Sequence, residues 1–501
     1  MVMSDVVRVE PVDEVYVRVT AEPSIAQEIA DAFTYEVPGA RFTPRFQAGL
    51  WDGKIALFSI YRPVFYKGLV TELYKFCVKN GYRLSVAPGV APKSHEVEKS
   101  WASEITADVF EDREYQLNAF TEALQMDRGV FLSSTSSGKT LMIYRLMLFY
   151  SEELEKPSLM LTTRTNLVAQ AALDFAKYSA GKVEVRVGKV VEGSIRDAVA
   201  DSNDLVVCTW QSALRAEKKW FAKFGAIIAD EAHSWDSGAF VKIAERANTV
   251  KYRFGFTGTL DGSKVNRMVL TGLFGPVITV STNKERVDAG DVAKPRITCI
   301  RLIYPSEEKK LAAKFGTNEQ GKRVPMRYGQ EIEHIIASKA RRDVVVELCA
   351  SLKGNTLVLF NRNEKYGIPL FEELKRKAAD RECRLVYGAT DVEDRIAVQR
   401  LMEEKDNVIA QASLGTFSEG MSVDNIRNVI FTWPMKGQVR LLQSIGRGLR
   451  KMVGKETCRF YDIVDDLRWK RRDNHLWKHA MIRCQIYDAE GFEYSWREIE
   501  I

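Results

Sequence analysis

The eight residues 133–140, SSTSSGKT, have the composition of a loop that binds phosphate groups. They follow the strand-like run GVFL and precede the helical run LMIYRLMLFY, which is the context that such a loop requires. Backbone N–H groups at a helix N-terminus can hold the phosphates of ATP, a lysine adds positive charge, and a threonine hydroxyl can bind Mg²⁺. A serine replaces the first glycine of the usual motif, and the alternative is a serine-rich turn with a solvated lysine. The predicted ATP-binding residues are Ser136, Ser137, Gly138, Lys139 and Thr140.

Residues 230–233, DEAH, end the apolar run GAIIA, and an acid at the carboxyl end of such a strand can face a phosphate loop. Two adjacent carboxylates allow two roles. Asp230 would bind Mg²⁺, and Glu231 would orient and deprotonate the attacking water. Alone, the tetrapeptide fits the solvated start of a helix equally well. Downstream of a phosphate loop, it predicts ATP hydrolysis.

The segment 443–450, QSIGRGLR, places Gln443, Arg447 and Arg450 in a charged helical stretch. Planar guanidinium groups suit phosphate recognition. Supplied by a second domain, they would complete an ATP site only on domain closure, which would couple hydrolysis to motion. The alternative is a basic helix face paired with nearby acids. We predict a catalytic role for the three residues.

Short apolar runs separated by helical stretches make up most of the chain after residue 110. The runs GVFLSS, PSLMLT, DLVVCT and GAIIAD form one series, and NTLVLFN, CRLVYG, NVIAQAS and RNVIFTW form a second. This alternation predicts two tandem α/β domains with parallel sheets. The stretch 87–106, rich in Pro, Gly and polar residues, predicts a linker and a boundary near residue 90, and the second series begins after Lys294-Pro295. Domains are therefore expected at 1–90, 91–290 and 291–501, the larger two folding without the first. The polar span 304–335 is expected to be an insertion or a mobile loop.

The composition is that of a multidomain globular protein, with 501 residues, 46% hydrophobic and 28% charged. The first residues lack the apolar core of a signal peptide, and the apolar runs are short. Secretion and a membrane partner are therefore not supported, and a cytoplasmic location is expected. Seven scattered cysteines without a CxxC pair predict reduced, structural thiols rather than a zinc site.

Residues 1–85 alternate strand-like and helical segments, which predicts a small α+β domain. Its charge changes sign: residues 1–40 carry two basic and eight acidic residues, whereas residues 41–83 carry eight basic and two acidic residues. Ten aromatic side chains lie among the latter, and aromatic faces stack on bases while cations bind phosphates. About half of these aromatics are expected to form the domain's own core. The residues that best fit a DNA contact are Arg41, Arg45, Trp51 and Lys54.

A second basic run, RWKRR at 468–472, is followed by Trp477 and Lys478. It is a further candidate nucleic-acid contact, and the alternative is a solvated helix face.

SSTSSGKT, DEAH and QxxGRxxR, in this order, resemble the motifs of superfamily 2 helicases across residues 110–465. The resemblance implies two RecA-like domains that bind ATP and Mg²⁺. It also gives roles to weaker motifs. REYQ at 113–116 implies an adenine contact by Gln116, and TRTNLVAQ and TWQ imply that Arg164 and Gln211 contact a nucleic-acid strand, although a threonine replaces the common proline of the former.

TGT at 257–259 and the segment 413–422 resemble the family's remaining motifs. They imply residues that couple ATP hydrolysis to nucleic-acid binding, together with the histidine of DEAH. The usual acid after the glycine of the second motif is replaced by Ser422, which leaves a ribose contact open. The implied coupling residues are His233, Thr257, Thr259 and Gly420.

A closer resemblance extends nearly end to end. RFTPRF at 41–46, WDGKI at 51–55 and GLV at 68–70 are similar to segments of the UvsW-type recombination helicases of T-even phages. This resemblance implies an enzyme that migrates Holliday junctions, regresses stalled forks and removes R-loops, with branched or forked DNA and RNA–DNA hybrids as partners. Two alternatives remain open: an RNA helicase with the same motor, and a remodeller that uses ATP as a clamp without processive unwinding.

Overall fold

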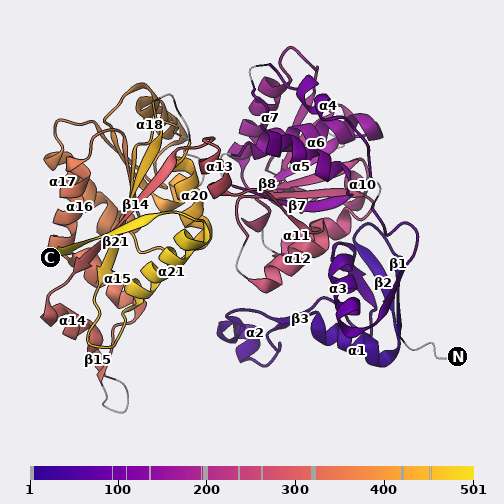
Figure 1. Ribbon diagram of the computed structural model, residues 1–501, viewed down its shortest axis with the longest axis horizontal. Helices are drawn as coiled ribbons and strands as arrows, with labels where there is room; N and C mark the ends of the chain where they lie inside the picture. The colour runs from indigo at the N-terminus through magenta and orange to yellow at the C-terminus, as the bar shows by residue number, and fades with distance from the viewer. Residues whose placement is uncertain are drawn as a thin grey trace. The chain divides into compact units, whose positions relative to one another are not determined.

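The computed structural model describes residues 5–92, 94–108, 110–134, 137–192, 195, 201–234, 237–260, 263–317, 323–418, 423–450, 452 and 454–501. The chain divides into two compact units, residues 1–281 and 282–501. Each unit has a seven-stranded sheet, and the first also has a four-stranded sheet near its N-terminus (Figure 1). The predicted fold class, two tandem α/β domains after a small α+β domain, is confirmed.

The N-terminal domain packs two helices on a four-stranded sheet with the order β5-β2-β1-β6. Valines alternate with polar residues in its two central strands. Val7, Val9, Val17 and Val19 are buried, because alternate side chains of a strand point to the same face. The elements are β1 (Val6–Pro11), β2 (Tyr16–Thr20), α1 (Pro23–Ala32), β5 (Val64–Tyr66), α3 (Val70–Asn80) and β6 (Arg83–Val86).

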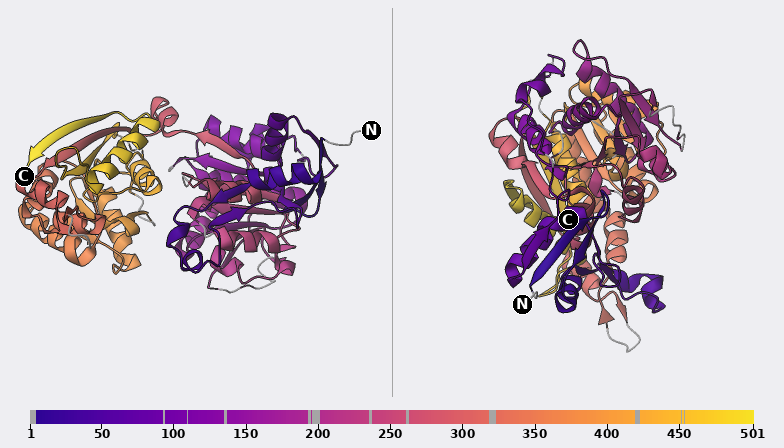
Figure 2. Two further views of the ribbon diagram at one scale, coloured as in Figure 1. Left: turned by 90° about the horizontal axis from the view of Figure 1, so that it is seen from below. Right: turned by 90° about the vertical axis from the view of Figure 1, so that its right-hand side faces the viewer.

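Between α1 and β5 the chain leaves this sheet as an arm, which we define as residues 34–56. Two short strands, β3 (Thr34–Glu36) and β4 (Lys54–Ala56), pair antiparallel at its base. They enclose η1 (Ala40–Phe42) and α2 (Pro44–Gln47), and α2 stands away from the sheet of the domain (Figures 1 and 2). None of residues 41–50 is buried, so the arm presents its side chains instead of packing them.

The sheet of the first α/β domain has the order β13-β7-β12-β11-β8-β10-β9, and all of its paired strands are parallel. The carboxyl ends of its strands therefore lie at one edge, where ligands bind in open α/β sheets. The strands are β7 (Arg128–Ser133), β8 (Ser158–Thr162), β9 (Val187–Val190), β10 (Leu205–Thr209), β11 (Ala226–Asp230), β12 (Tyr252–Thr257) and β13 (Val277–Ser281).

Helices cover both faces of this sheet. One core is formed with α5 (Glu114–Leu124), α6 (Lys139–Leu154) and α7 (Thr165–Ser179). The opposite core is formed with α11 (Ser237–Arg246) and α12 (Lys264–Phe274), and it continues without a break into the N-terminal domain, including Phe65, Leu69 and Leu73. The N-terminal domain and the first α/β domain thus share one hydrophobic core.

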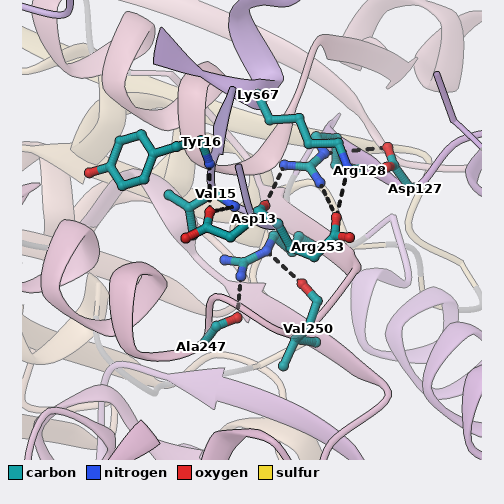
Figure 3. Close-up of polar contacts among 10 residues, drawn as sticks. Asp13, Val15, Tyr16, Lys67, Asp127, Arg128, Ala247, Val250 and Arg253 are labelled. Carbon is teal, nitrogen blue, oxygen red and sulfur yellow. Dashed lines mark hydrogen bonds and ion pairs between the residues drawn. The ribbon is translucent and has the colours of Figure 1, made fainter. Parts of the chain in front are cut away.

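Polar contacts reinforce this shared core (Figure 3). Lys67 lies 2.7 Å from a carboxylate oxygen of Glu14 and 3.7 Å from Asp127. Arg128 donates to the Glu14 carbonyl at 3.0 Å and lies 3.3 Å from its carboxylate. Backbones also approach closely: a Cβ on Gly68 would meet the backbone oxygen of Thr271 at 2.2 Å. Residues 1–90 therefore cover part of α12 and extend the core of the first α/β domain, and the expectation that the larger domains fold without them stays a prediction that these contacts weigh against.

The second unit has the sheet order β18-β19-β17-β20-β21-β14-β22, and its pairings are again parallel. Ion pairs lie inside it: Arg341 is fully buried and lies 2.7 Å from Asp465 of the sheet. The strands are β14 (Lys294–Ile303), β17 (Thr356–Phe360), β18 (Cys383–Val386), β19 (Ile409–Ser413), β20 (Asn428–Phe431), β21 (Thr457–Asp466) and β22 (Tyr494–Glu500). Its long helices include α16 (Lys339–Ser351), α17 (Ile368–Lys377), α18 (Val392–Glu404), α20 (Gln438–Gly448) and α21 (His475–Ala489).

The span 304–335 is more regular than its polar composition predicts. It contains α14 (Ser306–Ala313), the short antiparallel strands β15 (Gly316–Thr317) and β16 (Arg323–Val324), and most of α15 (Tyr328–Ala337). Ile332, Ile335 and Ile336 are buried on one side of α15, at the spacing of a helix that packs through a single face. The prediction of a loop was wrong because the few apolar residues that form the buried face of α15 are spaced among many polar residues.

All seven cysteines are buried and outside disulfides. Across the described ranges, no helix is long and apolar enough to cross a membrane.

Candidate ATPase site and nucleic-acid surfaces

The phosphate loop connects β7 to α6, as its sequence context predicts. Gly138 has a φ of +83°, which favours glycine, and a Cβ there would meet the Gln116 amide nitrogen at 2.3 Å. Lys139 begins the helix, and its ammonium lies 3.4 Å from the Ser133 carbonyl. Thr140 follows in the same turn and is half-buried, whereas Ser136 lies outside the described residues. The loop therefore has the glycine, lysine and threonine of a phosphate site at one helix N-terminus.

Gln116 holds this loop from α5. Its amide donates to the Ser137 carbonyl at 2.7 Å, and its oxygen accepts from the Arg113 N–H at 3.4 Å. The Tyr115 hydroxyl donates to the same Ser137 carbonyl at 3.0 Å. The predicted adenine contact is thus placed beside the phosphate loop, with its amide engaged by the chain itself.

The DEAH carboxylates stand opposite the lysine. Asp230 ends β11 and Glu231 follows it with a φ of +48°, so the chain turns sharply after the strand. One Glu231 carboxylate oxygen lies 3.8 Å from the Lys139 ammonium. Burial, and then the neighbouring Glu231 charge, raise the pKa of Asp230 to about 7. A half-buried carboxylate beside a second negative charge is stabilised by a cation, which fits the predicted Mg²⁺ role.

A chain of contacts leads from this site into the sheet. His233 Nδ1 lies 3.4 Å from a Glu231 oxygen and 2.5 Å from the Thr257 hydroxyl. That hydroxyl donates its single proton to the Thr259 carbonyl at 2.7 Å, so it must accept from His233, which places a proton on Nδ1. Three of the predicted coupling residues are therefore connected in space, and the fourth, Gly420, lies outside the described residues.

Arg164 and Gln211 line one groove. Arg164 precedes α7 and Gln211 follows β10, and both side chains are exposed. The Gln211 amide donates to the Thr163 carbonyl at 3.3 Å, which joins the two motifs. The groove has a volume of about 440 Å³, and its lining residues are Thr163, Arg164, Thr165, Asn166, Glu192, Thr209, Gln211, Ser212 and Arg215. Arg215 is a cation of this groove that the sequence motifs did not single out.

The arm carries the predicted N-terminal contacts. Arg41, Arg45 and Lys54 are exposed, as predicted for a DNA contact, but Trp51 is only half-exposed and its indole N–H donates to the Lys54 carbonyl at 2.8 Å. The exposed apolar side chains of the arm are instead Phe42, Phe46 and Leu50, which are 70%, 38% and 75% exposed. The Arg41 guanidinium lies 4.8 Å from the centre of the Phe42 ring. Cationic and apolar side chains are therefore presented together.

In the second unit, Gln443, Arg447 and Arg450 are half-buried while the residues between them are buried. Gln443 and Arg447 lie one turn apart on α20, and Arg450 follows its end. Arg447 lies 5.6 Å from the centre of the Phe417 ring, and Arg450 lies 3.4 Å from Asp424. The latter contact matches the alternative of a basic residue paired with a local acid, whereas all three residues keep a partly open face.

Two family models match this chain. The description "DNA helicase UvsW, N-terminal" matches residues 6–87, and "Type III restriction enzyme, res subunit" matches residues 109–262. The chain is 30% identical to "ATP-dependent DNA helicase uvsW" of Enterobacteria phage T4 over 97% of this chain and 98% of that protein. It is 20% identical to "DNA 3'-5' translocase XPB2" of Sulfurisphaera tokodaii over 69% of this chain and 80% of that one. The crystal structure of T4 UvsW matches at a TM-score of 0.51 and 29% identity, covering 99% of both chains.

Proposed function

The chain belongs to the UvsW family of ATP-dependent DNA helicases, and from this premise we propose that it remodels branched DNA, by migrating Holliday junctions, regressing forks and unwinding R-loops. The observation that supports this most is the exposed arm, which adds a cationic and aromatic surface to a helicase motor. A motor that only moves along one strand needs no DNA-binding surface beyond the groove of Arg164 and Gln211. An additional basic surface on the same rigid unit favours a substrate with more than one duplex arm.

The proposed hydrolysis uses the residues around the phosphate loop. Backbone N–H groups of Ser136 to Gly138 and the Lys139 ammonium bind the ATP phosphates, and Gln116 reads the adenine. Thr140 and Asp230 hold Mg²⁺, which when bound neutralises charge on the phosphates. Glu231 accepts a proton from the attacking water. Its position supports this role, since one carboxylate oxygen lies 3.8 Å from the Lys139 ammonium of the phosphate loop.

Three residues of the second unit serve the same reaction in this proposal. Arg447 and Arg450 stabilise negative charge that develops on the transferring phosphate, and Gln443 supports them from the same helix. The partly open face of these side chains supports this role.

The proposed coupling route starts at Glu231. Its carboxylate contacts His233, which hydrogen-bonds Thr257, and Thr257 in turn fixes Thr259. A change in charge at Glu231 during hydrolysis alters the hydrogen-bonding of the histidine, and Gly420 is assigned to the same coupling on the family resemblance.

DNA binding is assigned to two surfaces of the first unit. Arg164 and Gln211 contact the backbone of one strand, which gives little sequence preference. Arg41, Arg45 and Lys54 contact phosphates of a second arm of the branch, and Phe42 stacks on an exposed base. Trp51 stabilises the arm, because its indole N–H donates a hydrogen bond to the Lys54 carbonyl.

Charge reversal on the arm tests the proposal. Arg41→Glu with Arg45→Glu should lower affinity for a four-way junction by about tenfold or more, yet leave ATPase stimulation by single-stranded DNA within about twofold of the unchanged protein. The matched control is Arg8→Glu with Lys79→Glu, two exposed cations of the same domain outside the arm. An equal loss of affinity for the four-way junction in both double variants, or no loss in either, would refute the branched-DNA proposal.

The same assay separates the open alternatives. Stimulation by RNA equal to or above that by DNA would favour an RNA helicase. ATP hydrolysis stimulated by junctions without any strand displacement would favour a clamp.

A further inference from the structure

We propose that the second unit carries an additional nucleic-acid contact, formed where the turn 469–472 meets residues 312–313 and 325–331. We call this the C-terminal basic surface, with Lys470, Arg471, Arg472, His475 and Lys478 as its cationic and imidazole side chains. It rests on the proposed function in one respect, since DNA is taken as the ligand.

Two segments far apart in the sequence are joined at this surface. The Glu331 carboxylate on α15 accepts hydrogen bonds from the backbone N–H groups of His475 and Leu476, at 2.9 and 3.0 Å. It thereby caps the first turn of α21, a role that residues just before a helix usually fill. The two helices and β15 lie at the same end of the second unit (Figure 1). The span 304–335 therefore helps to position the basic run.

A small cavity lies between the two segments. Its volume is about 170 Å³, below the size of a pocket for a drug-sized molecule but open to a single polar group. One wall comes from residues 312–313 and 325–331, and the other comes from residues 467–478 around the basic run. The lining residues are Ala312, Ala313, Pro325, Met326, Glu331, Leu467, Arg472, Asp473, Asn474, His475 and Lys478.

The tip of the basic run is a tight turn. Trp469 and Arg472 exchange backbone hydrogen bonds of 3.2 and 3.0 Å, which leaves Lys470 and Arg471 at the tip. Lys470 has a φ of +54°, a conformation that favours glycine and costs another residue roughly 1 kcal/mol. A lysine at such a position is disfavoured by the fold, so a role for its charge is the simplest reason for its presence.

The base of the turn is fixed. Arg468 lies 2.9 Å from Asp466 at the end of β21 and 3.5 Å from the centre of the Trp477 ring. In contrast, the side chains of Lys470, Arg471 and Arg472 form no hydrogen bond or ion pair within the described part of the chain. The turn therefore presents three unpaired cations from a rigid base, and all three are exposed.

The chemistry of this surface fits nucleic acid better than protein. Residues 468–478 contain five basic residues and one acid. Lysine is depleted in the cores of protein interfaces, whereas clustered Lys and Arg together with an exposed aromatic ring suit phosphates and a base. The Tyr328 ring is 38% exposed and its centre lies 6.5 Å from that of His475. The turn also follows the carboxyl end of β21, and ligands of parallel α/β sheets bind at that edge.

Two variants test the surface. Arg471→Gln with Arg472→Gln should weaken binding to single-stranded DNA about fivefold and reduce the slope of log affinity against log salt by about 1.4, or roughly 0.7 per lost phosphate contact. Lys470→Gly should also reduce the slope, while raising or preserving the unfolding temperature, because glycine relieves the left-handed conformation. If Lys470 had a purely structural role, Lys470→Gly would instead lower the unfolding temperature.

The matched control is Lys375→Gln with Arg376→Gln, two exposed cations on α17 of the same unit. Loss of affinity and slope in the test variants but not in this control would support the inference. Affinity and slope equal to the control would overturn it, and a protein-docking role would then be the better explanation. If the unchanged protein itself fails to bind DNA, the proposed function has failed instead.

Discussion

The backbone carbonyl of Glu14 accepts a hydrogen bond of 3.0 Å from Arg128, and this contact joins the N-terminal domain to the first motor domain inside a shared core. Lys67 and Asp127 complete the buried cluster. Breaking one partner of such a cluster costs roughly 3 to 5 kcal/mol, because a buried charge is left without compensation. The N-terminal domain, which carries the arm, is therefore fixed to the first motor domain, and deleting residues 1–90 would disturb that motor domain as well as remove the arm.

A single methyl group added at Gly68 should weaken the packing between the N-terminal domain and the first motor domain. Gly68→Ala places a Cβ 2.2 Å from the Thr271 backbone oxygen, so the backbones must separate, and we expect a loss of about 1 to 3 kcal/mol in stability. Gly329→Ala is the matched control, because a Cβ there meets nothing within 4 Å. Thermal unfolding compares the two variants. Equal melting temperatures would show that the two domains are less tightly joined than their contacts indicate.

Asp230→Asn should stabilise the nucleotide-free protein in a pH-dependent way. Burial and Glu231 raise the pKa of Asp230 from 3.8 to about 7, so folding favours the protonated form. The stability that this provides is complete below pH 4 and is lost as the pH rises through 7, a difference of at most roughly 4 kcal/mol. The Asp230→Asn variant has no such loss of stability, because an asparagine side chain does not ionise. Its melting temperature should exceed that of the unchanged protein at pH 8 but not at pH 4, while Mg²⁺-dependent turnover disappears.

Lys139 and Glu231 should separate nucleotide binding from hydrolysis. Lys139→Ala removes the charge that we propose binds the phosphates and that lies 3.8 Å from Glu231, so turnover should vanish in a folded protein. Glu231→Gln keeps the lysine, Thr140 and Asp230, and should bind ATP while hydrolysing it at least about 100-fold more slowly. Equilibrium binding of a fluorescent ATP analogue, beside turnover, distinguishes the two. Loss of binding in both variants would contradict the division of roles.

Arg447→Ala should lower DNA-stimulated ATPase by about 100-fold or more and change ATP affinity by less than about threefold, on the proposal that it acts mainly in the transition state. Gln443→Ala, one turn earlier on α20, should have a smaller effect. Steady-state kinetics with and without DNA provide both constants. A comparable loss of ATP affinity would indicate a contact made already in the ground state.

The sequence predicts which elements meet at the candidate ATPase site, because the signals for these elements are local. A run such as GVFL followed by SSTSSGKT fixes both the strand and the loop after it, and DEAH follows its own strand in the same way. Parallel strands then bring Lys139 and Glu231 to one edge of the sheet.

The remaining features depend on contacts between residues whose local sequence patterns do not indicate that they meet. Glu14 and Arg128 are 114 residues apart, and nothing in either segment indicates that they meet. The half-burial of Trp51 follows from its hydrogen bond to Lys54 within the arm. Glu331 looks like an ordinary helix carboxylate until the fold places it at the start of α21.

Conversion of a synthetic four-way junction into duplex arms, measured for the unchanged protein and for Glu231→Gln with ATP and Mg²⁺ present, tests the central claim most directly. The unchanged protein should resolve the junction and hydrolyse ATP, while Glu231→Gln should bind the junction with similar affinity and leave it intact. Junction-stimulated hydrolysis by the unchanged protein without any conversion, or conversion by Glu231→Gln at the same rate, would contradict it.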